Sequence, residues 1–104
     1  MVLGPRPPRV SELNALADVG LVTLSWAIDA SRSIATEQVV EVGFAPGQTL
    51  VRLPVAADAT SLAVAGAPPG HYYVRIRSMN GTGAGVPSNE VRVVVPEPGW
   101  LDLR

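Results

Sequence analysis

Proline and glycine interrupt this chain so often that it has little room for a long helix. The 104 residues include ten prolines and ten glycines, spread along the whole length. Proline lacks the N–H that a helix needs and clashes with the preceding turn, while glycine clusters favour turns. The segments between them are short, and many alternate between apolar and polar residues as strands do. The sequence therefore predicts an all-β protein.

Several segments of the chain carry the two-residue period of a strand. The seven are residues 10–17, 21–28, 37–44, 49–55, 60–65, 71–79 and 91–95. In the second, Val22, Leu24 and Trp26 share one face, so Trp26 is predicted to be the central core residue. The first is the weakest, and a short helix capped by Ser11 is the alternative there. Seven strands with turn signals at this spacing predict a two-sheet antiparallel sandwich of the immunoglobulin-like class.

Residues 71–79 form the longest alternating run. Tyr72 is in phase with the apolar residues of this run, and Tyr73 is in phase with its arginines. Successive side chains of a strand point to opposite faces, so Tyr72 is predicted to be buried and Tyr73 exposed. The glycine-rich residues 80–85 that follow are predicted to form a loop.

Proline-rich segments flank the strands at both ends. Residues 1–7 are interpreted as a linker, residues 8–95 as the domain, and residues 96–104 as a tail or the start of the next linker. The tail carries Trp100, Leu101 and Leu103, and such an apolar group favours docking on the domain or on another chain. The first residues lack the pattern of a signal peptide, so any export signal is expected to lie outside this sequence.

The charge pattern argues against nucleic-acid binding. The formal net charge is −1, and all eight basic residues are arginines scattered along the sequence. A phosphate backbone requires a clustered basic surface. The sequence also lacks cysteine, and no apolar run approaches the roughly 18 residues of a spanning helix. We therefore expect neither nucleic-acid binding nor membrane insertion, and we expect a monomer.

Residue patterns that carry catalysis or bind metals are missing from the sequence. His71 is the only histidine, and no Gly-x-Ser-x-Gly motif occurs. Glu37, Glu41 and Asp58 are expected to be solvated surface charges rather than an acid–base pair. No stretch clusters the acidic oxygens that calcium prefers. The sequence therefore predicts a protein that is not an enzyme and that uses no cofactor or metal.

Four segments together resemble the fibronectin type III domains of large bacterial extracellular proteins. They are residues 22–26, 42–47, 69–80 and 87–91, and the resemblance covers roughly residues 8–95. It implies that Trp26 is a core residue and that Tyr72 is the tyrosine-corner residue, whose hydroxyl bonds to an upstream backbone group. Two positions depart from the family pattern: Gln38 replaces an aromatic residue and Ala67 replaces leucine. A thinner core is predicted at both.

One surface of the predicted sandwich has the character of a binding face. The candidate partner-binding residues are Tyr73, Arg75, Arg77 and Arg92, because tyrosine and arginine are enriched at interface hot spots. In this fold the third, sixth and seventh strands share a sheet. Glu41 and Glu90 are therefore expected to flank Arg75 and Arg77 as cross-strand ion pairs.

The resemblance implies a module of a larger protein. We expect a non-catalytic spacer or protein-interaction and adhesion unit of a bacterial extracellular or cell-surface protein, with neighbouring domains as its first partners. A partner beyond the parent chain would be a protein or a glycan. The alternative is an accessory carbohydrate-binding domain next to a secreted hydrolase, using Tyr73, Phe44 or Trp100.

Overall fold

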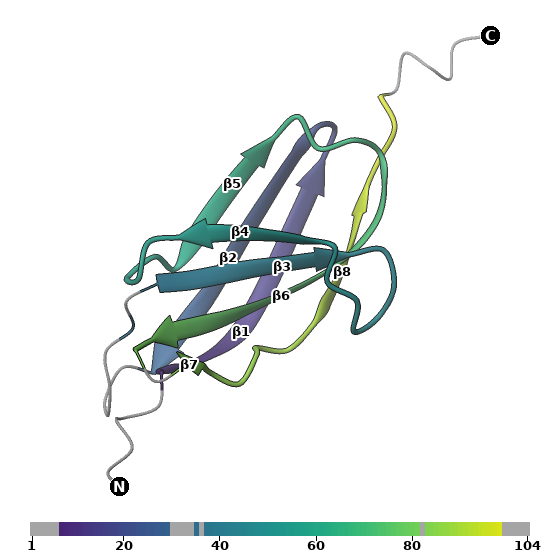
Figure 1. The fold of residues 1–104 in the computed structure, drawn as a ribbon. Coiled ribbons are helices and arrows are strands. Elements are labelled where there is room, and N and C mark those ends of the chain that lie inside the picture. Colours follow the sequence, from purple (N-terminus) through teal and green to yellow (C-terminus); the bar gives the residue numbers. More distant parts are fainter. Residues whose placement is uncertain (1–6, 30–34, 36, 82, 99–104) are drawn as a thin grey trace, which may run out of the picture.

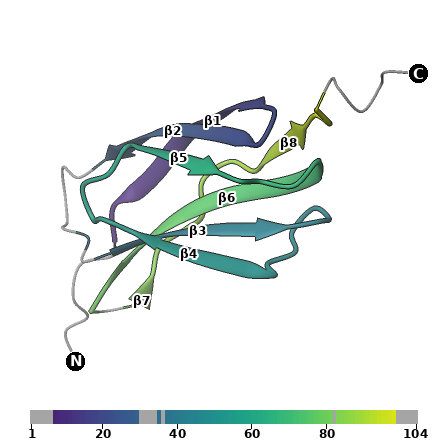
Figure 2. The same cartoon turned by 90° about the horizontal axis from the view of Figure 1, so that it is seen from above.

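Two antiparallel sheets stack as layers in the structure, a computed structural model that describes residues 7–29, 35, 37–81 and 83–98 (Figures 1 and 2). The first sheet has the order β1 (Arg9–Asp18), β2 (Leu21–Asp29) and β5 (Ser61–Ala65). In the second, β4 (Val51–Val55), β3 (Glu37–Gly43), β6 (Gly70–Asn80) and β7 (Gly83–Ala84) follow in order, and β8 (Val91–Val95) also pairs with β6. The predicted sandwich is confirmed.

The strands lie where the alternating pattern placed them, with one addition. The first segment is strand β1, so the alternative helix capped by Ser11 is wrong. The third, sixth and last predicted strands share a sheet, as expected. The addition is the two-residue strand β7, which lies in the glycine-rich segment predicted as a loop and pairs with the end of β6.

Strand β1 contains a bulge that keeps two apolar side chains in the core. Its register with β2 shifts between Ser11 and Asn14, and Glu12 between them has a φ of 56°. Without the shift, Val10 and Leu13 would point to opposite faces, because they are three residues apart. With it, both are buried in the core, at 1% and 2% exposure.

The core lies between the sheets and draws on both. Its buried members are Val10, Leu13, Val22, Leu24, Trp26, Val40, Val74, Ile76, Val93 and Val95. Trp26 is 6% exposed, which confirms its predicted place in the core. Burying such an aromatic side chain removes more apolar area from water than any other single residue here can. The core is otherwise built largely from valine, whose branched side chain suits strands.

Gln38 corrects the prediction of a thinner core at its position. Its side chain is fully buried, and its Oε1 accepts a 2.9 Å hydrogen bond from Trp26 Nε1. Its Nε2 donates to the carbonyls of Ala56 and Ala59, at 2.9 and 2.7 Å, and more weakly to that of Ala57. The amide is thus packed inside the core with both of its polar atoms hydrogen-bonded.

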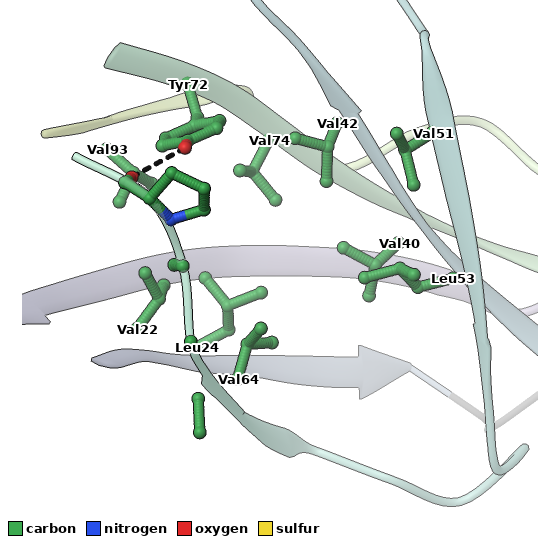
Figure 3. Close-up of a pocket in the computed structure, with 14 residues that line it drawn as sticks. Val22, Leu24, Val40, Val42, Val51, Leu53, Val64, Tyr72, Val74 and Val93 are labelled. Atoms are coloured by element: carbon green, nitrogen blue, oxygen red, sulfur yellow. Dashed lines mark hydrogen bonds between the residues drawn. The ribbon is translucent and has the colours of Figure 1, made fainter. Parts of the chain in front are cut away.

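The prediction at Ala67 is confirmed by a cavity between the sheets. Figure 3 shows this cavity, which has a volume of about 270 Å³ and an almost wholly apolar lining. Its wall comes from both sheets, and it is completed by Ala65 at the end of β5 and by Gly66, Ala67 and Pro68 after it. Ala67 and its small neighbours line this space, so the core is thin at that position.

Tyr72 forms the predicted corner, although its burial differs from the prediction. Its hydroxyl donates a 2.6 Å hydrogen bond to the carbonyl of Pro68, four residues upstream. Its ring lies 5.8 Å from that of Phe44, centroid to centroid. Tyr72 and Tyr73 are both half-buried, so the expected contrast between them is wrong. Tyr73 is partly covered because it lies on β6 between Gly43 of β3 and Arg92 of β8.

The predicted linker and tail fall largely outside the described residues. Only Pro7 of the linker and residues 96–98 of the tail are described, so the predicted docking of Trp100, Leu101 and Leu103 lies beyond them. The predicted domain boundaries likewise remain predictions. In the part of the chain that is described, no helix has the length and apolar character needed to span a membrane.

We expect Tyr72→Phe to lower the free energy of unfolding by about 0.5–1.5 kcal/mol, because it removes the hydroxyl that bonds to Pro68. Tyr73→Phe is the matched control and should change stability by less than about 0.5 kcal/mol. Urea unfolding followed by tryptophan fluorescence measures both. Equal losses in the two variants would contradict the corner assignment.

Ala67→Leu should raise the free energy of unfolding by about 0.5–2 kcal/mol, because the larger side chain fills part of the cavity. Ala63→Leu is a matched control, since Ala63 is an exposed residue of β5 that does not line the cavity. Thermal unfolding of both variants tests this expectation. A destabilised Ala67→Leu with an unchanged control would mean that the cavity cannot accept the added carbons.

Candidate interaction face

The outer face of the second sheet brings together the four residues selected from the sequence. Tyr73, Arg75 and Arg77 alternate along β6 and therefore point to the same side of the sheet. Arg92 of β8 lies directly opposite Tyr73 in the antiparallel register. Directly opposed residues share a face, so all four residues belong to one surface.

A row of charges crosses this face at its centre. Glu41 of β3 lies opposite Arg52 of β4 on one side and opposite Arg75 of β6 on the other. Arg75 Nε donates to Glu41 Oε1 at 2.7 Å, and Arg77 Nη2 lies 3.1 Å from the same oxygen. Arg52 Nε lies 3.7 Å from Oε2, which is an ion pair but too long for a hydrogen bond. One carboxylate therefore accepts hydrogen bonds from two guanidinium groups and forms a longer ion pair with a third.

Glu41 is buried, which corrects the expectation of a solvated surface charge. It points away from the core, but it is only 4% exposed because the arginines lie over it. Burial by itself raises the pKa of the Glu41 carboxyl. The hydrogen bonds and positive charges of Arg75 and Arg77 outweigh burial, so the pKa falls below its ordinary value of 4.5. Glu41 therefore stays ionised at neutral pH.

Further contacts fix the guanidinium groups that hold Glu41. Arg75 Nη2 donates to Thr49 Oγ1 at 3.2 Å, and Arg77 Nη1 makes a long 3.5 Å contact to the carbonyl of Gly85. The side chains of Arg75 and Arg77 are each 23% exposed, whereas that of Arg52 is 71% exposed. Two arginines are thus held in place, and the third projects into solvent.

The predicted ion pairing of Glu90 with Arg75 and Arg77 is wrong. The Glu90 carboxylate accepts a hydrogen bond from the backbone N–H of Gly47, at 3.0 Å, in the turn between β3 and β4. Arg92, two residues further along the chain, donates from Nη2 to Nδ1 of His71, the exposed histidine of β6. Glu90 therefore stabilises a turn, and of the two predicted ion-pair partners only Glu41 pairs with Arg75 and Arg77.

A cleft lies beside the charged row. It has a volume of about 200 Å³, and its lining residues are Val39, Glu41, Arg52, Arg75, Arg77, Met79 and Ala84. Three guanidinium groups and one carboxylate leave it with an excess of positive charge. Within the described residues, no group of three His, Cys, Asp or Glu side chains is placed to hold a metal ion. The cleft is therefore suited to binding an anion.

Arg52 belongs to this face but was not among the residues predicted for it from the sequence. The alternation in β4 contained a signal, because Arg52 is out of phase with the inward-facing Leu53 and Val55. Its partner was not evident, since the pairing of Glu41 with Arg52 depends on how β3 and β4 are aligned across the turn that joins them. A shift of that alignment by one residue would move Arg52 to the other face relative to Glu41.

No protein-family model matches this chain, and no curated protein matches it in sequence. Solved structures do match. A myokine structure aligns with a TM-score of 0.68 at 14% identity, covering 90% of this chain and 100% of the other. An Fn3-like protein from Clostridium thermocellum aligns with a TM-score of 0.67 at 18% identity, covering 88% and 97%. The chain has the fold of a fibronectin type III domain.

A third match shows the same fold inside a longer protein. The FN1–FN3 domains of chicken CNTN1 align with a TM-score of 0.70 at 16% identity, and the match covers 86% of this chain and 30% of that one. Fibronectin type III domains are generally non-catalytic modules of larger proteins. At these identities the likeness concerns the fold alone.

The stability of this chain should depend on pH through Glu41. Because the folded pKa lies below the ordinary value of 4.5, the stabilisation is fully present above that value and is lost as the pH falls through the folded pKa. Glu41→Gln should lower the free energy of unfolding at pH 7 by about 1–3 kcal/mol, because charged hydrogen bonds are lost. It should also flatten the acid limb of the stability curve.

Urea unfolding between pH 3 and 7 measures this effect. Glu37→Gln is the control, because Glu37 is an exposed residue of the same strand. An acid limb in Glu41→Gln as steep as in the unsubstituted chain would show that other groups set the pH dependence.

Proposed function

We propose that this domain is a protein-interaction module of a larger protein and that it binds its partner through the outer face of the second sheet. The observation that carries the proposal is the charged row of Arg52, Glu41 and Arg75. Exposed ion pairs usually contribute little and are poorly fixed, whereas here one buried carboxylate holds Arg75 and Arg77 in place with Arg52 beside them. Arginines held in fixed positions are suited to recognition, because less side-chain entropy is lost on binding.

The rest of the face supports the same proposal. Tyr73 and Arg92 lie in register at its other end, and Tyr73 is half-buried. A half-buried tyrosine supplies a rigid contact surface, and tyrosine and arginine are enriched among hot-spot residues. The four strands that carry the face form a broad, regular surface rather than a set of loops (Figure 1).

We infer the cellular setting from the resemblance of the landmark segments. Residues 22–26, 42–47, 69–80 and 87–91 resemble those of bacterial extracellular modules, which supports a secreted or cell-surface parent protein. In such a protein, this rigid sandwich would hold its neighbouring domains a set distance apart. A spacer role is therefore compatible with the binding role.

A second candidate function is carbohydrate binding. The observation in its favour is Phe44, which is 65% exposed and packs beside the ring of Tyr72. Exposed aromatic rings offer a platform on which a sugar can stack. Phe44 lies at the end of the sandwich rather than on the arginine face, so the two candidate functions use different surfaces.

A peptide-display selection against the domain tests the proposed function. We expect selected peptides to protect backbone amides of β3, β6 and β8 from hydrogen exchange, and to lose binding to an Arg92→Glu variant. Thr23→Glu is the matched control, since Thr23 is an exposed residue of β2 in the other sheet. Selected ligands that protect only the Phe44 turn, or a selection that yields no ligand, would contradict it.

A further inference from the structure

We propose that the cleft lined by Arg52, Arg75 and Arg77 is a carboxylate subsite that receives acidic side chains of a partner peptide. This inference rests on the proposed function, because it assigns the chemistry that one part of the interaction face recognises. It concerns the cleft of about 200 Å³ between β4, β3, β6 and β7.

Charge is the first argument. Three guanidinium groups line the cleft with a single carboxylate, although the chain as a whole has a formal net charge of −1. The cleft is therefore a local concentration of positive charge on a weakly acidic molecule. Such a site attracts anions and is complementary to an acidic segment.

The three arginines of the cleft differ in their exposure and in their contacts with Glu41. Arg75 and Arg77 already donate to Glu41, and their side chains are mostly buried. Arg52 differs, because its side chain is 71% exposed and its 3.7 Å contact with Glu41 is too long for a hydrogen bond. Its guanidinium group is therefore free to form the paired hydrogen bonds by which arginine recognises a carboxylate.

Glu41 acts here as a positioning residue. Its carboxylate holds Arg75 and Arg77 side by side over β3 and neutralises only part of their charge. A ligand carboxylate would add a second anion on the Arg52 side of the cleft, where positive charge is in excess. The ligand therefore meets guanidinium groups that are already oriented, which lowers the entropy cost of binding.

The remaining lining favours a peptide over an acidic sugar. Val39, Met79 and Ala84 supply apolar surface beside the arginines. An aspartate or glutamate side chain carries its carboxylate on an aliphatic stem that can pack on such a surface. A sugar ring would present hydroxyl groups there instead, and the lining contains no aromatic ring for it to stack on.

Methyl NMR of the intact chain tests this subsite. The probe is the peptide acetyl-Gly-Glu-Glu-Gly-amide, and its glutamine counterpart is the neutral control. We expect the glutamate peptide to shift the methyl signals of Val39, Met79 and Ala84 in a saturable, salt-sensitive way, and the glutamine peptide to leave them unchanged. Arg52→Gln should weaken the affinity about tenfold, as expected for the loss of a charged hydrogen bond.

Arg9→Gln is the matched control variant, because Arg9 is an exposed residue of β1 in the other sheet and should bind the peptide as before. Equal shifts with both peptides, or an Arg52→Gln variant with unchanged affinity, would overturn the carboxylate subsite even if displayed peptides bind this face. Tighter binding of an oligogalacturonate than of the glutamate peptide would overturn the assignment to a peptide. Peptides selected elsewhere on the domain would instead refute the proposed function, while the titration would still report on the cleft.

Discussion

The hydrogen bond between Trp26 and Gln38 joins the two sheets inside the core. Trp26 belongs to β2 of the first sheet and Gln38 to β3 of the second. The same glutamine donates to carbonyls at residues 56, 57 and 59, in the connection that crosses from β4 to β5. One buried amide thus fixes the two layers and the chain between them. Because every polar atom of the pair is satisfied, the arrangement avoids the cost of burying an amide alone.

Strand β3 connects this hydrogen bond to the interaction face, because it contains both Gln38 and Glu41. Gln38 points into the core from β3, and Glu41 points out of the sheet from the same strand, three residues later. An odd separation places two strand residues on opposite faces. Holding Gln38 therefore fixes the register that brings Glu41 opposite Arg52 and Arg75. The proposed binding face depends in this way on a hydrogen bond on the other side of the sheet.

Alternation within each segment was enough to predict most strand positions and the common face of Tyr73, Arg75 and Arg77 along β6. These features depend on the two-residue period, which is local in the sequence. Placing Arg92 on the interaction face also needed the strand order of the fold that the landmark segments resemble. The contacts of single side chains were harder to predict. The burial of Glu41 requires two arginines from β6, 34 and 36 residues away, and the role of Gln38 requires carbonyls of a later loop. Such contacts depend on the alignment of distant segments, which a single sequence does not specify.

Trp26 and Gln38 act as one unit that joins the two sheets, and a double-mutant cycle tests this coupling most directly. The free energy of unfolding would be measured for the unsubstituted chain, Trp26→Phe, Gln38→Leu and the double variant. Each single change leaves a buried partner without its hydrogen bond, whereas the double change removes both groups. We predict that the double variant is more stable than the sum of the single losses implies, by about 1 kcal/mol or more. Losses that add to within about 0.3–0.5 kcal/mol would contradict the account.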